Sequence, residues 1–262
     1  MTVADALAVA GVEMRDARIL LAEATGFSHA ALAGFPERRI PADAKERFCE
    51  FVARRRSGEP VAYIVGHKEF YGLGLAVNPA ALIPRPETEL LVELALERPF
   101  ASALDLGTGS GAVALALKKH RPAAAVTAVE ASAAALLLAR RNAAKHGLEI
   151  EFLHGDWFGP VGDRRFELIV ANPPYVAAGD PHLADLRFEP VQALVAGADG
   201  LADIRSIVKA APSHLERGGW LLLEHGAGQD ERVRRLLEQA GLENVRTWPD
   251  LARIPRVTGG KA

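Results

Sequence analysis

A glycine-rich turn between a strand-like run and a helix-like run constrains this chain more than any other feature. The sequence DLGTGSG at 105–111 ends the apolar run 103–107 and opens directly into the helical run 111–120. Glycines let a backbone turn sharply and approach a ligand closely, and open α/β sheets bind ligands where their strands end. The spacing is G-x-G-x-G, which differs from the G-x-G-x-x-G turn of dinucleotide-binding folds. We therefore expect a different ligand at Gly107, Thr108, Gly109, Ser110 and Gly111.

Strand-like and helix-like runs alternate after residue 100. This alternation predicts a mostly parallel, doubly wound α/β sheet. The strand-like runs are 103–107, 125–130, 150–155, 166–172 and 219–226, and the helical runs are 111–120, 132–146 and 201–215. Two weaker runs, 244–248 and 255–260, are expected to add edge strands.

The first 60 residues have a different, helical pattern. Ser28 is expected to cap a short helix that ends at Gly34, and Pro41 to start a helix that runs to about Arg56. Residues 68–78 carry two short β-prone runs, which predict a hairpin between the two parts of the chain.

Composition narrows the class of protein. The chain has 262 residues with a formal net charge of -2, so it lacks the basic excess of domains that coat nucleic acid. The single cysteine, Cys49, excludes a disulfide framework and a cysteine-rich zinc site; we expect Cys49 in the core and no bound metal. No signal peptide and no membrane span are recognisable, so we expect a cytoplasmic protein.

A polar side chain ends the second predicted strand, and two more residues of interest follow the third. A carboxylate at Glu130 can accept hydrogen bonds from both hydroxyls of a ribose. The Asp156 carboxylate can accept from an exocyclic amine, and the Trp157 indole can stack on a purine. With no phosphate-binding lysine, the three positions favour S-adenosylmethionine over ATP as the ligand.

The fourth predicted strand ends in the sequence NPPY at 172–175. Proline has no backbone N–H, so Pro173 and Pro174 leave carbonyl acceptors and remove two donors, and Asn172 adds a side-chain carbonyl. Such a pocket should hold an NH2 group by both hydrogens, with the face of Tyr175 against a planar amide or base. We predict that residues Asn172, Pro173, Pro174 and Tyr175 bind the substrate.

The chemistry of an amide explains this use of acceptors. The lone pair of an amide nitrogen is delocalised, so the nitrogen is a poor nucleophile. Hydrogen bonds to the Asn172 Oδ1 atom and the Pro173 carbonyl would draw the nitrogen toward a tetrahedral shape, with its lone pair aimed at a sulfonium methyl group. Alignment of this kind contributes up to roughly 7–11 kcal/mol in favourable intramolecular reactions. Asn172, Pro173 and Tyr175 are the predicted catalytic residues.

Nearly the whole chain resembles the release factor glutamine methyltransferases of the HemK type. The stretch IPRPETE within 82–89 is the most diagnostic. The other matching stretches are AYIVG at 62–66, the turn 105–111, GDWF at 155–158, NPPY at 172–175, RFEP at 187–190, DGL at 199–201 and EHG at 224–226.

This resemblance implies a fold and an activity. It implies a helical release-factor-recognition domain at 1–66, a β-hairpin linker at 67–80, and a seven-stranded, Rossmann-like class I methyltransferase domain at 81–262. It implies methyl transfer from S-adenosylmethionine, which becomes S-adenosylhomocysteine, to N5 of the glutamine in the Gly-Gly-Gln loop of class 1 peptide release factors. It also implies cofactor contacts from the turn 107–111, Glu130, Trp157 and Asn172. We expect a monomer that binds a release factor and no nucleic acid directly.

Other functions stay open at this stage. An adenine-N6 methyltransferase acting on DNA or RNA would use the same NPPY sequence on an exocyclic amine. A non-catalytic cofactor-binding partner protein is a second alternative, although both motifs are intact. The arginines at 54–56 could contact a partner or end a solvated helix, Arg85 could orient substrate or form a salt bridge, and Glu224 could border the active site.

Two positions depart from the family pattern. The family often has Asp where this chain has Glu130, a change that keeps the carboxylate. Ile254 and Pro255 precede the final Arg-Val-Thr, and proline is expected to weaken strand pairing there.

Overall fold

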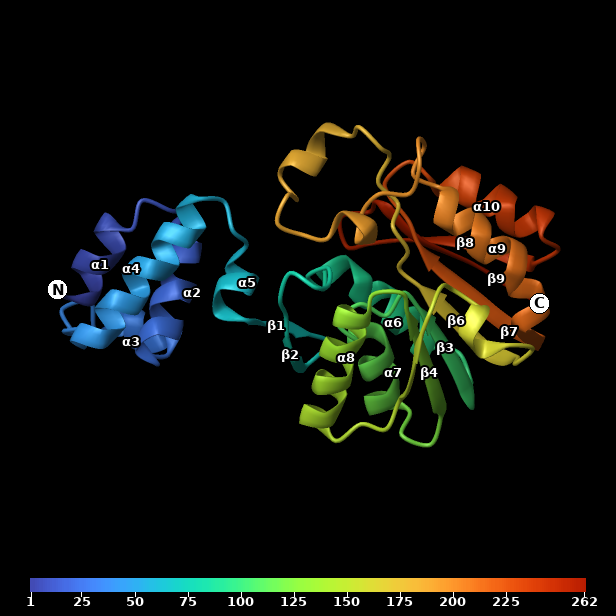
Figure 1. Cartoon of the computed structure of the whole chain (residues 1–262), viewed down its shortest axis with the longest axis horizontal. Helices are drawn as coiled ribbons and strands as arrows, with labels where there is room; N and C mark the ends of the chain where they lie inside the picture. The colour runs from blue at the N-terminus through green and yellow to red at the C-terminus, as the bar shows by residue number, and fades with distance from the viewer. The chain divides into compact units, whose positions relative to one another are not determined.

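The computed structural model describes all residues from Met1 to Ala262. The chain divides into two compact units, Met1–His67 and Lys68–Ala262. Figure 1 draws the first unit in the colours from blue to cyan and the second in those from teal to red. None of the helices is both long enough and apolar enough to cross a membrane.

The first unit is built from helices alone. They are α1 (Val3–Val9), α2 (Met14–Thr25), α3 (His29–Gly34), α4 (Ala42–Arg56) and α5 (Val61–Val65). Buried apolar side chains such as Leu20 and Leu21 of α2 and Phe48 and Val52 of α4 make its core. The Ser28 hydroxyl accepts a hydrogen bond from the Ala31 N–H at 3.1 Å, which confirms the predicted cap of α3.

Cys49 lies on the surface, so its predicted place in the core is wrong. Phe48 and Val52 are four residues apart and share the buried face of α4, because four residues bring a helix back to the same side. Cys49 follows Phe48 by one position and therefore points about 100° away from that face.

The arginines at the end of α4 are bonded inside the first unit. Arg54 pairs with Glu59, and Arg55 pairs with Asp16 at 2.7 Å. The Arg56 guanidinium donates to the carbonyls of α1, including that of Ala10 at 3.0 Å. These bonds account for all three arginines as structural residues of the helical unit.

A short hairpin opens the second unit. Strands β1 (His67–Phe70) and β2 (Leu73–Ala76) are joined by Tyr71 and Gly72, whose φ angles are 49° and 72°. Two consecutive residues with positive φ form the turn that best fits the twist of a two-residue hairpin. The fully buried Asn142 carboxamide bonds to both backbone groups of Ala76 and donates to the Ser110 carbonyl, so it ties β2 to the glycine turn.

A seven-stranded sheet forms the centre of the second unit, in the order β5-β4-β3-β6-β7-β9-β8. Its first five strands in this order run parallel, which confirms the predicted doubly wound sheet. The strands are β3 (Ser102–Leu106), β4 (Ala125–Glu130), β5 (Glu151–His154), β6 (Phe166–Ala171), β7 (Leu215–Glu224), β8 (Glu243–Pro249) and β9 (Pro255–Lys261).

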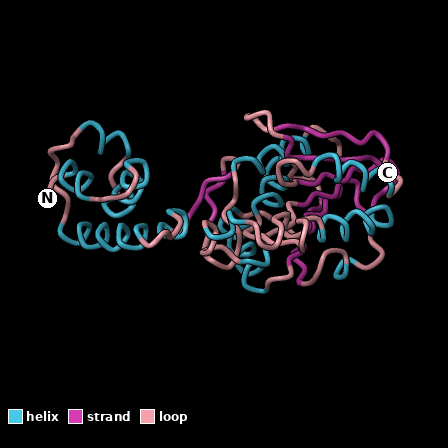
Figure 2. The backbone as a smooth tube through the Cα atoms, turned by 90° about the horizontal axis from the view of Figure 1, so that it is seen from above, coloured by secondary structure: helices cyan, strands magenta, loops and turns pink.

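Helices cover both faces of this sheet (Figures 1 and 2). One face packs against α6 (Glu89–Leu96), α7 (Ala112–His120) and α8 (Ala133–His146), and the other against α9 (Ala202–His214) and α10 (Asp230–Gln239). Because the parallel strands all end at the same edge, the loops that follow β3, β4, β5, β6 and β7 gather there.

The final strand is an interior strand, not the edge strand that the sequence predicted. β9 lies antiparallel between β7 and β8, and only β8 is at the edge. Pro255 is the first residue of β9, a position where a strand tolerates proline. A Cβ atom at Gly259 would meet the Leu222 side chain at 2.4 Å, so the glycine allows β9 to pack closely on its neighbour.

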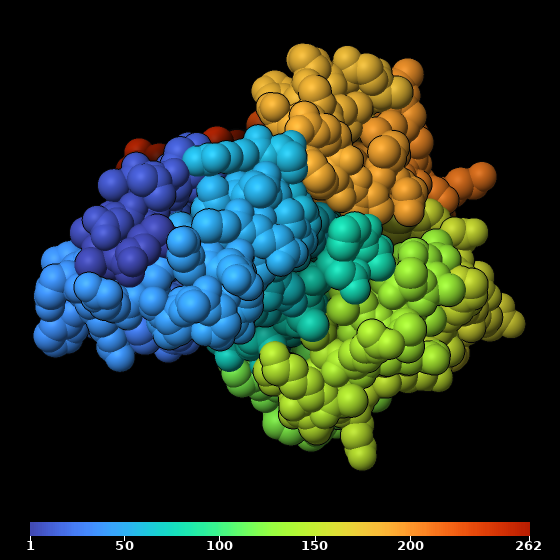
Figure 3. Space-filling view, turned by 60° about the vertical axis from the view of Figure 1, so that its left-hand side comes forward, coloured from blue at the N-terminus to red at the C-terminus, as the bar shows by residue number.

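The segment between β6 and α9 extends away from the sheet. It contains two short 3-10 helices, η3 (Pro181–Ala184) and η4 (Val191–Ala193). Figure 3 shows this segment as a raised lobe in gold and orange. Val176 pairs with Val195 in a parallel bridge, which closes the base of the lobe next to the end of β6.

Candidate active site

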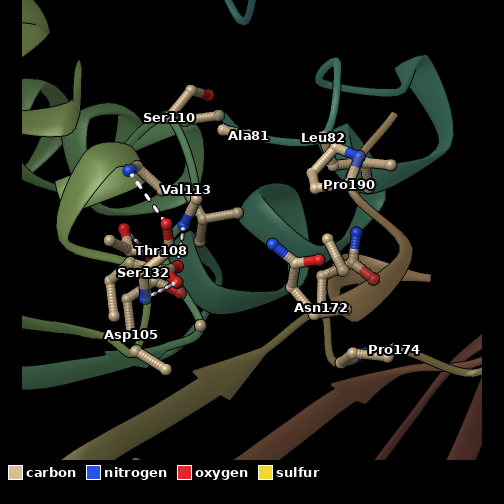
Figure 4. Close-up of a pocket in the computed structure, with 18 of the residues that line it drawn as sticks. Ala81, Leu82, Asp105, Thr108, Ser110, Val113, Ser132, Asn172, Pro174 and Pro190 are labelled. Carbon is tan, nitrogen blue, oxygen red and sulfur yellow. Dashed lines mark hydrogen bonds between the residues drawn. The ribbon is translucent and has the colours of Figure 1, made fainter. Parts of the chain in front are cut away.

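A cavity of about 290 Å³ opens where the parallel strands end. Its walls come from the glycine turn after β3, the loops after β4, β5 and β6, the segment before α6 and the lobe (Figure 4). The predicted site residues on its walls are Gly107, Thr108, Gly109, Ser110, Glu130, Asp156, Trp157, Asn172 and Pro174. Gly111, Pro173 and Tyr175 do not line the cavity.

The three glycines of the turn have positive φ angles but different surroundings. A Cβ atom at Gly107 would meet the Trp157 ring at 3.3 Å, and one at Gly109 would meet nothing within 4 Å. A Cβ atom at Gly111 would meet the Leu115 side chain at 2.6 Å and that of Ala139 at 3.2 Å. Gly111 therefore lets α7 pack against α8, whereas Gly107 and Gly109 leave backbone open to the cavity.

Asp105 lies directly below the turn and lines the cavity, a role that the sequence analysis did not assign. Its Oδ2 atom accepts hydrogen bonds from the Thr108 hydroxyl at 2.6 Å and from the Ala114 N–H at 3.1 Å. Burial raises the pKa of Asp105 to about 6, and the Glu130 carboxylate adds to this. The sequence signal that could have identified Asp105 as a cavity residue is an acidic side chain in a buried strand, just before a glycine turn.

Glu130 joins the turn to the loop after β4. Its carboxylate accepts from the Gly109 N–H at 2.8 Å and from the Ser132 N–H at 2.9 Å. A carboxylate has about four lone-pair positions, so two accepted bonds leave room for two further donors. Glu130 is thus fixed in direction and is still able to accept hydrogen bonds from a ligand.

Asp156 and Trp157 form the wall beyond Glu130. Trp157 has a φ of 42°, a conformation that few non-glycine residues adopt, and its half-buried ring lies over Gly107. Asp203, at the start of α9, lines the same wall. Burial, followed by the nearby Asp156 carboxylate, raises the pKa of Asp203. This side of the cavity combines an aromatic surface with carboxylate acceptors.

Asn172 stands across the cavity from the glycine turn. Figure 4 shows its side chain in the space between Thr108 and Ser132 on one side and Leu82 and Pro190 on the other. The Asn172 Nδ2 atom donates to the Thr88 hydroxyl at 3.1 Å. Because the amide nitrogen is held by Thr88, the Oδ1 atom is the acceptor that Asn172 offers to the cavity.

Tyr175 lies behind this wall. Its ring packs on the core on the α9 side of the sheet, and its hydroxyl donates to the Glu224 Oε1 atom at 3.4 Å. Burial, followed by the Glu224 carboxylate, raises the pKa of Tyr175, so the hydroxyl keeps its proton. The buried Gln229 amide donates to the Tyr175 carbonyl at 3.0 Å and fixes the end of the NPPY sequence.

A buried ion pair fixes the rim of the cavity. Glu189, in the lobe between η3 and η4, accepts from the Arg85 guanidinium and from the Ile83 N–H at 3.0 Å. Arg85, Thr88 and Pro190 line the cavity. Sequence reasoning left the role of Arg85 undecided and did not single out Thr88, although both lie in the IPRPETE stretch.

This arrangement defines a class of protein. The strand order, the glycine turn and the carboxylates at the ends of β3 and β4 are those of a class I S-adenosylmethionine-dependent methyltransferase. A family model described as "Methyltransferase small domain" matches residues 86–199. The catalytic domain of human Mettl16 has a similar fold, with a TM-score of 0.59 and 14% identity over 83% of this chain and 79% of that one. A methyltransferase from Pyrococcus furiosus has a TM-score of 0.58 and 19% identity over 80% and 96%.

Full-length relatives give the particular family. A second family model, described as "PrmC N-terminal domain", matches residues 2–66. The release factor glutamine methyltransferase of Pseudomonas aeruginosa is 52% identical over 94% of this chain and 91% of its own length. That of Burkholderia pseudomallei is 47% identical over 99% and 96%. The chain belongs to the release factor glutamine methyltransferase family.

Proposed function

We propose that the protein transfers a methyl group from S-adenosylmethionine to the N5 atom of the glutamine in the Gly-Gly-Gln loop of class 1 peptide release factors. One observation carries this proposal. In a chain related over its full length to release factor glutamine methyltransferases, the Asn172 side chain faces the glycine turn across one cavity.

The walls of the cavity fit the charge of the proposed cofactor. Its carboxylates are those of Asp105, Glu130, Asp156 and Asp203, and Arg85 is its one basic side chain. A sulfonium carries a positive charge, which carboxylates stabilise, whereas the phosphates of ATP would be repelled. We propose that Glu130 accepts the ribose hydroxyls, that Trp157 contacts the adenine face, and that Asp156 accepts from the adenine amine.

The residues on the opposite wall prepare the substrate nitrogen. When bound, S-adenosylmethionine supplies a methyl group made electrophilic by its sulfonium. Asn172 Oδ1 accepts one hydrogen of the glutamine NH2 group, and we assign the second to the Pro173 carbonyl. These two bonds fix the direction of the nitrogen lone pair, because the positions of both hydrogens are then set.

The chain provides acceptors at the reacting nitrogen rather than a base. Asn172 does not take up a proton, and its Nδ2 atom is committed to Thr88. After transfer the nitrogen is cationic and acidic, so it loses its proton to solvent. Tyr175, held by Glu224 at its hydroxyl and by Gln229 at its carbonyl, supports the pocket from behind and keeps its phenol neutral.

We assign the parts of the chain as follows. Residues 1–66 recognise the release factor, 67–80 link the two parts, and 81–262 carry out the transfer. The first unit is compact on its own, and its arginines at 54–56 are bonded internally, so recognition falls to its remaining surface. We further propose a monomer that acts in the cytoplasm and does not bind nucleic acid directly.

The test uses S-adenosylmethionine with a labelled methyl group. The protein is incubated with a purified class 1 release factor, with the same factor carrying alanine in place of the loop glutamine, and with DNA. We expect label in the first factor alone, on a peptide that contains the Gly-Gly-Gln sequence. Equal labelling of both factors, or labelling of DNA alone, would contradict the proposal.

A further inference from the structure

A carboxyl group lies buried behind the Asn172 wall. Glu224 ends β7, and only 1% of its surface is exposed. Its Oε1 atom accepts from the Tyr175 hydroxyl, whereas its Oε2 atom is buried and has no partner at hydrogen-bonding geometry. Glu224 does not line the cavity and lies behind Tyr175. A buried carboxyl with an unused oxygen costs stability and requires an explanation.

Thr88 lies between this carboxyl and Asn172. It is 4% exposed and accepts a hydrogen bond from Asn172 Nδ2 at 3.1 Å. A hydroxyl has one proton to donate and two lone pairs. The Thr88 hydroxyl is also close enough to Glu224 to favour its charged form. Its lone pairs therefore face Asn172 when its proton faces Glu224.

We propose that Glu224 is a positioning residue: by accepting a hydrogen bond from the Thr88 hydroxyl, it turns the Thr88 lone pairs toward Asn172, which holds Asn172 with its amide oxygen toward the substrate. The same carboxylate accepts a hydrogen bond from the Tyr175 hydroxyl and so orders the tyrosine side of the pocket. This inference rests on the proposed function, because it gives Glu224 a role through the residue that contacts the substrate amide.

The charges around Glu224 decide its protonation. Burial raises the pKa of Glu224 to about 7. The hydroxyls of Thr88 and Tyr175 lower it, and so does the Arg256 guanidinium on β9. The Glu87 carboxylate, on the 3-10 helix η1 (Pro86–Thr88), raises it.

Ionisation changes the direction of the hydrogen bonds. A charged Glu224 only accepts, so both neighbouring hydroxyls must donate to it. A protonated Glu224 has a proton of its own to donate, and the Thr88 hydroxyl is then free to turn its proton toward Asn172. The Asn172 amide loses its fixed acceptor in that state. We expect kcat to rise as pH increases through about 7.

Three variants separate this role from a purely structural one. In Glu224→Gln and in Thr88→Val, kcat for a release factor should fall about ten- to a hundredfold, the range for loss of a hydrogen bond to a charged group. The Kd for S-adenosylmethionine should stay at the wild-type value, because neither Glu224 nor the Thr88 hydroxyl is assigned to the cofactor. Thr88→Ser keeps the hydroxyl and should keep most of the activity.

The pH profile and the double variant are decisive. Glu224→Gln should remove the rise of kcat near pH 7. The double variant, Thr88→Val with Glu224→Gln, should be no slower than the slower single variant, because both residues act through the same chain of hydrogen bonds to Asn172. Thermal unfolding is measured in parallel. Because burial favours the protonated form of Glu224, the Tm of wild type should fall relative to that of Glu224→Gln as pH rises from 6 to 8. Reduced activity of the variant would then not reflect loss of folding.

Two results would overturn the inference: Glu224→Gln with wild-type kcat and pH profile, or single-variant losses that add fully. Failure of the proposed function has a different signature. In that case the wild-type protein would label a release factor that lacks the loop glutamine, whatever residue 224 is.

Discussion

The two walls of the cavity are held in different ways. On the wall around the glycine turn, Thr108 bonds to Asp105 and Ser132 to Glu130. The bonds between strand ends reach only the adjacent strand, since the N–H groups of Gly107 and Thr108 donate to the Val129 carbonyl and that of Gly109 donates to Glu130. The Asn172 wall depends on residues far away in the sequence. Asn172 bonds to Thr88, 84 positions away, and Tyr175 bonds to Glu224 and Gln229, 49 and 54 positions away.

This difference separates binding from reaction. The glycine-turn wall is stabilised largely by its own neighbours and can present a preformed surface to the cofactor. The Asn172 wall needs the segment before α6, the lobe and the end of β7 to meet correctly. We therefore expect substitutions on the first wall to change cofactor affinity, and substitutions on the second to change turnover.

The largest expected effect is at Asn172. Asn172→Ala should lower kcat about a hundred- to a thousandfold, the scale for removing one oriented group that acts on the transition state. Cofactor affinity, measured by calorimetry, should change far less, because the other wall provides most of the cofactor contacts. If Asn172→Ala instead abolishes cofactor binding and leaves kcat at saturating cofactor normal, the proposed division between the two walls is wrong.

The matching substitution on the first wall is Glu130→Gln. Losing charged hydrogen bonds to a ribose should weaken cofactor binding about ten- to a hundredfold, with kcat at saturation nearly unchanged. Glu130→Asp keeps the carboxylate and should lie between wild type and Glu130→Gln. The exposed Glu149→Gln is a charge-matched control that should behave as wild type. A loss of kcat with normal affinity in Glu130→Gln would reverse the assignment of this wall.

Two glycines test whether the turn serves the ligand or the packing. Both Gly109→Ala and Gly111→Ala force a side chain into a left-handed conformation, so this strain is common to both. Only Gly111→Ala also drives a Cβ atom into Leu115 and Ala139, and overpacking costs typically about 1–3 kcal/mol. Gly111→Ala should have the lower Tm and Gly109→Ala the weaker cofactor binding. Equal Tm values would show that Gly111 has no packing role.

The smallest effect concerns Asp105 and pH. Its pKa is raised from 3.8 to about 6 in the folded protein, so the folded state binds more protons between these values than the unfolded state. Its contribution to stability is therefore lost as pH rises through about 6. Asp105→Asn should gain Tm relative to wild type between pH 5 and pH 8, by a few degrees at about 2–4 °C per kcal/mol. A difference independent of pH would mean that Asp105 titrates normally.

The sequence predicted the glycine-turn wall and the parallel sheet because their signals are local. Strand, turn and helix follow each other directly at 103–120, Glu130 ends a strand, and Trp157 comes shortly after one. The same reasoning missed Asp105 as a cavity residue and placed β9 at an edge. Its short run with two glycines and a leading proline resembles an exposed strand, and its place between β7 and β8 becomes visible only in the pairing of the folded sheet.

The contacts behind Asn172 could not be predicted in the same way. Thr88 and Glu224 lie in stretches that resemble the family, but no periodicity or spacing places them beside residue 172. Their proximity follows from how α6 and β7 pack around β6. The prediction for Cys49 was wrong for a related reason, because a shift of one position along α4 turns a side chain away from the buried face.

The most direct test is a crystal structure with S-adenosylhomocysteine and a release factor domain that carries the Gly-Gly-Gln loop. We predict that the glutamine amide nitrogen lies about 2.9 Å from Asn172 Oδ1, with the cofactor sulfur on the opposite side of that nitrogen. A glutamine side chain that docks elsewhere, with Asn172 bonded only to the cofactor, would contradict the account.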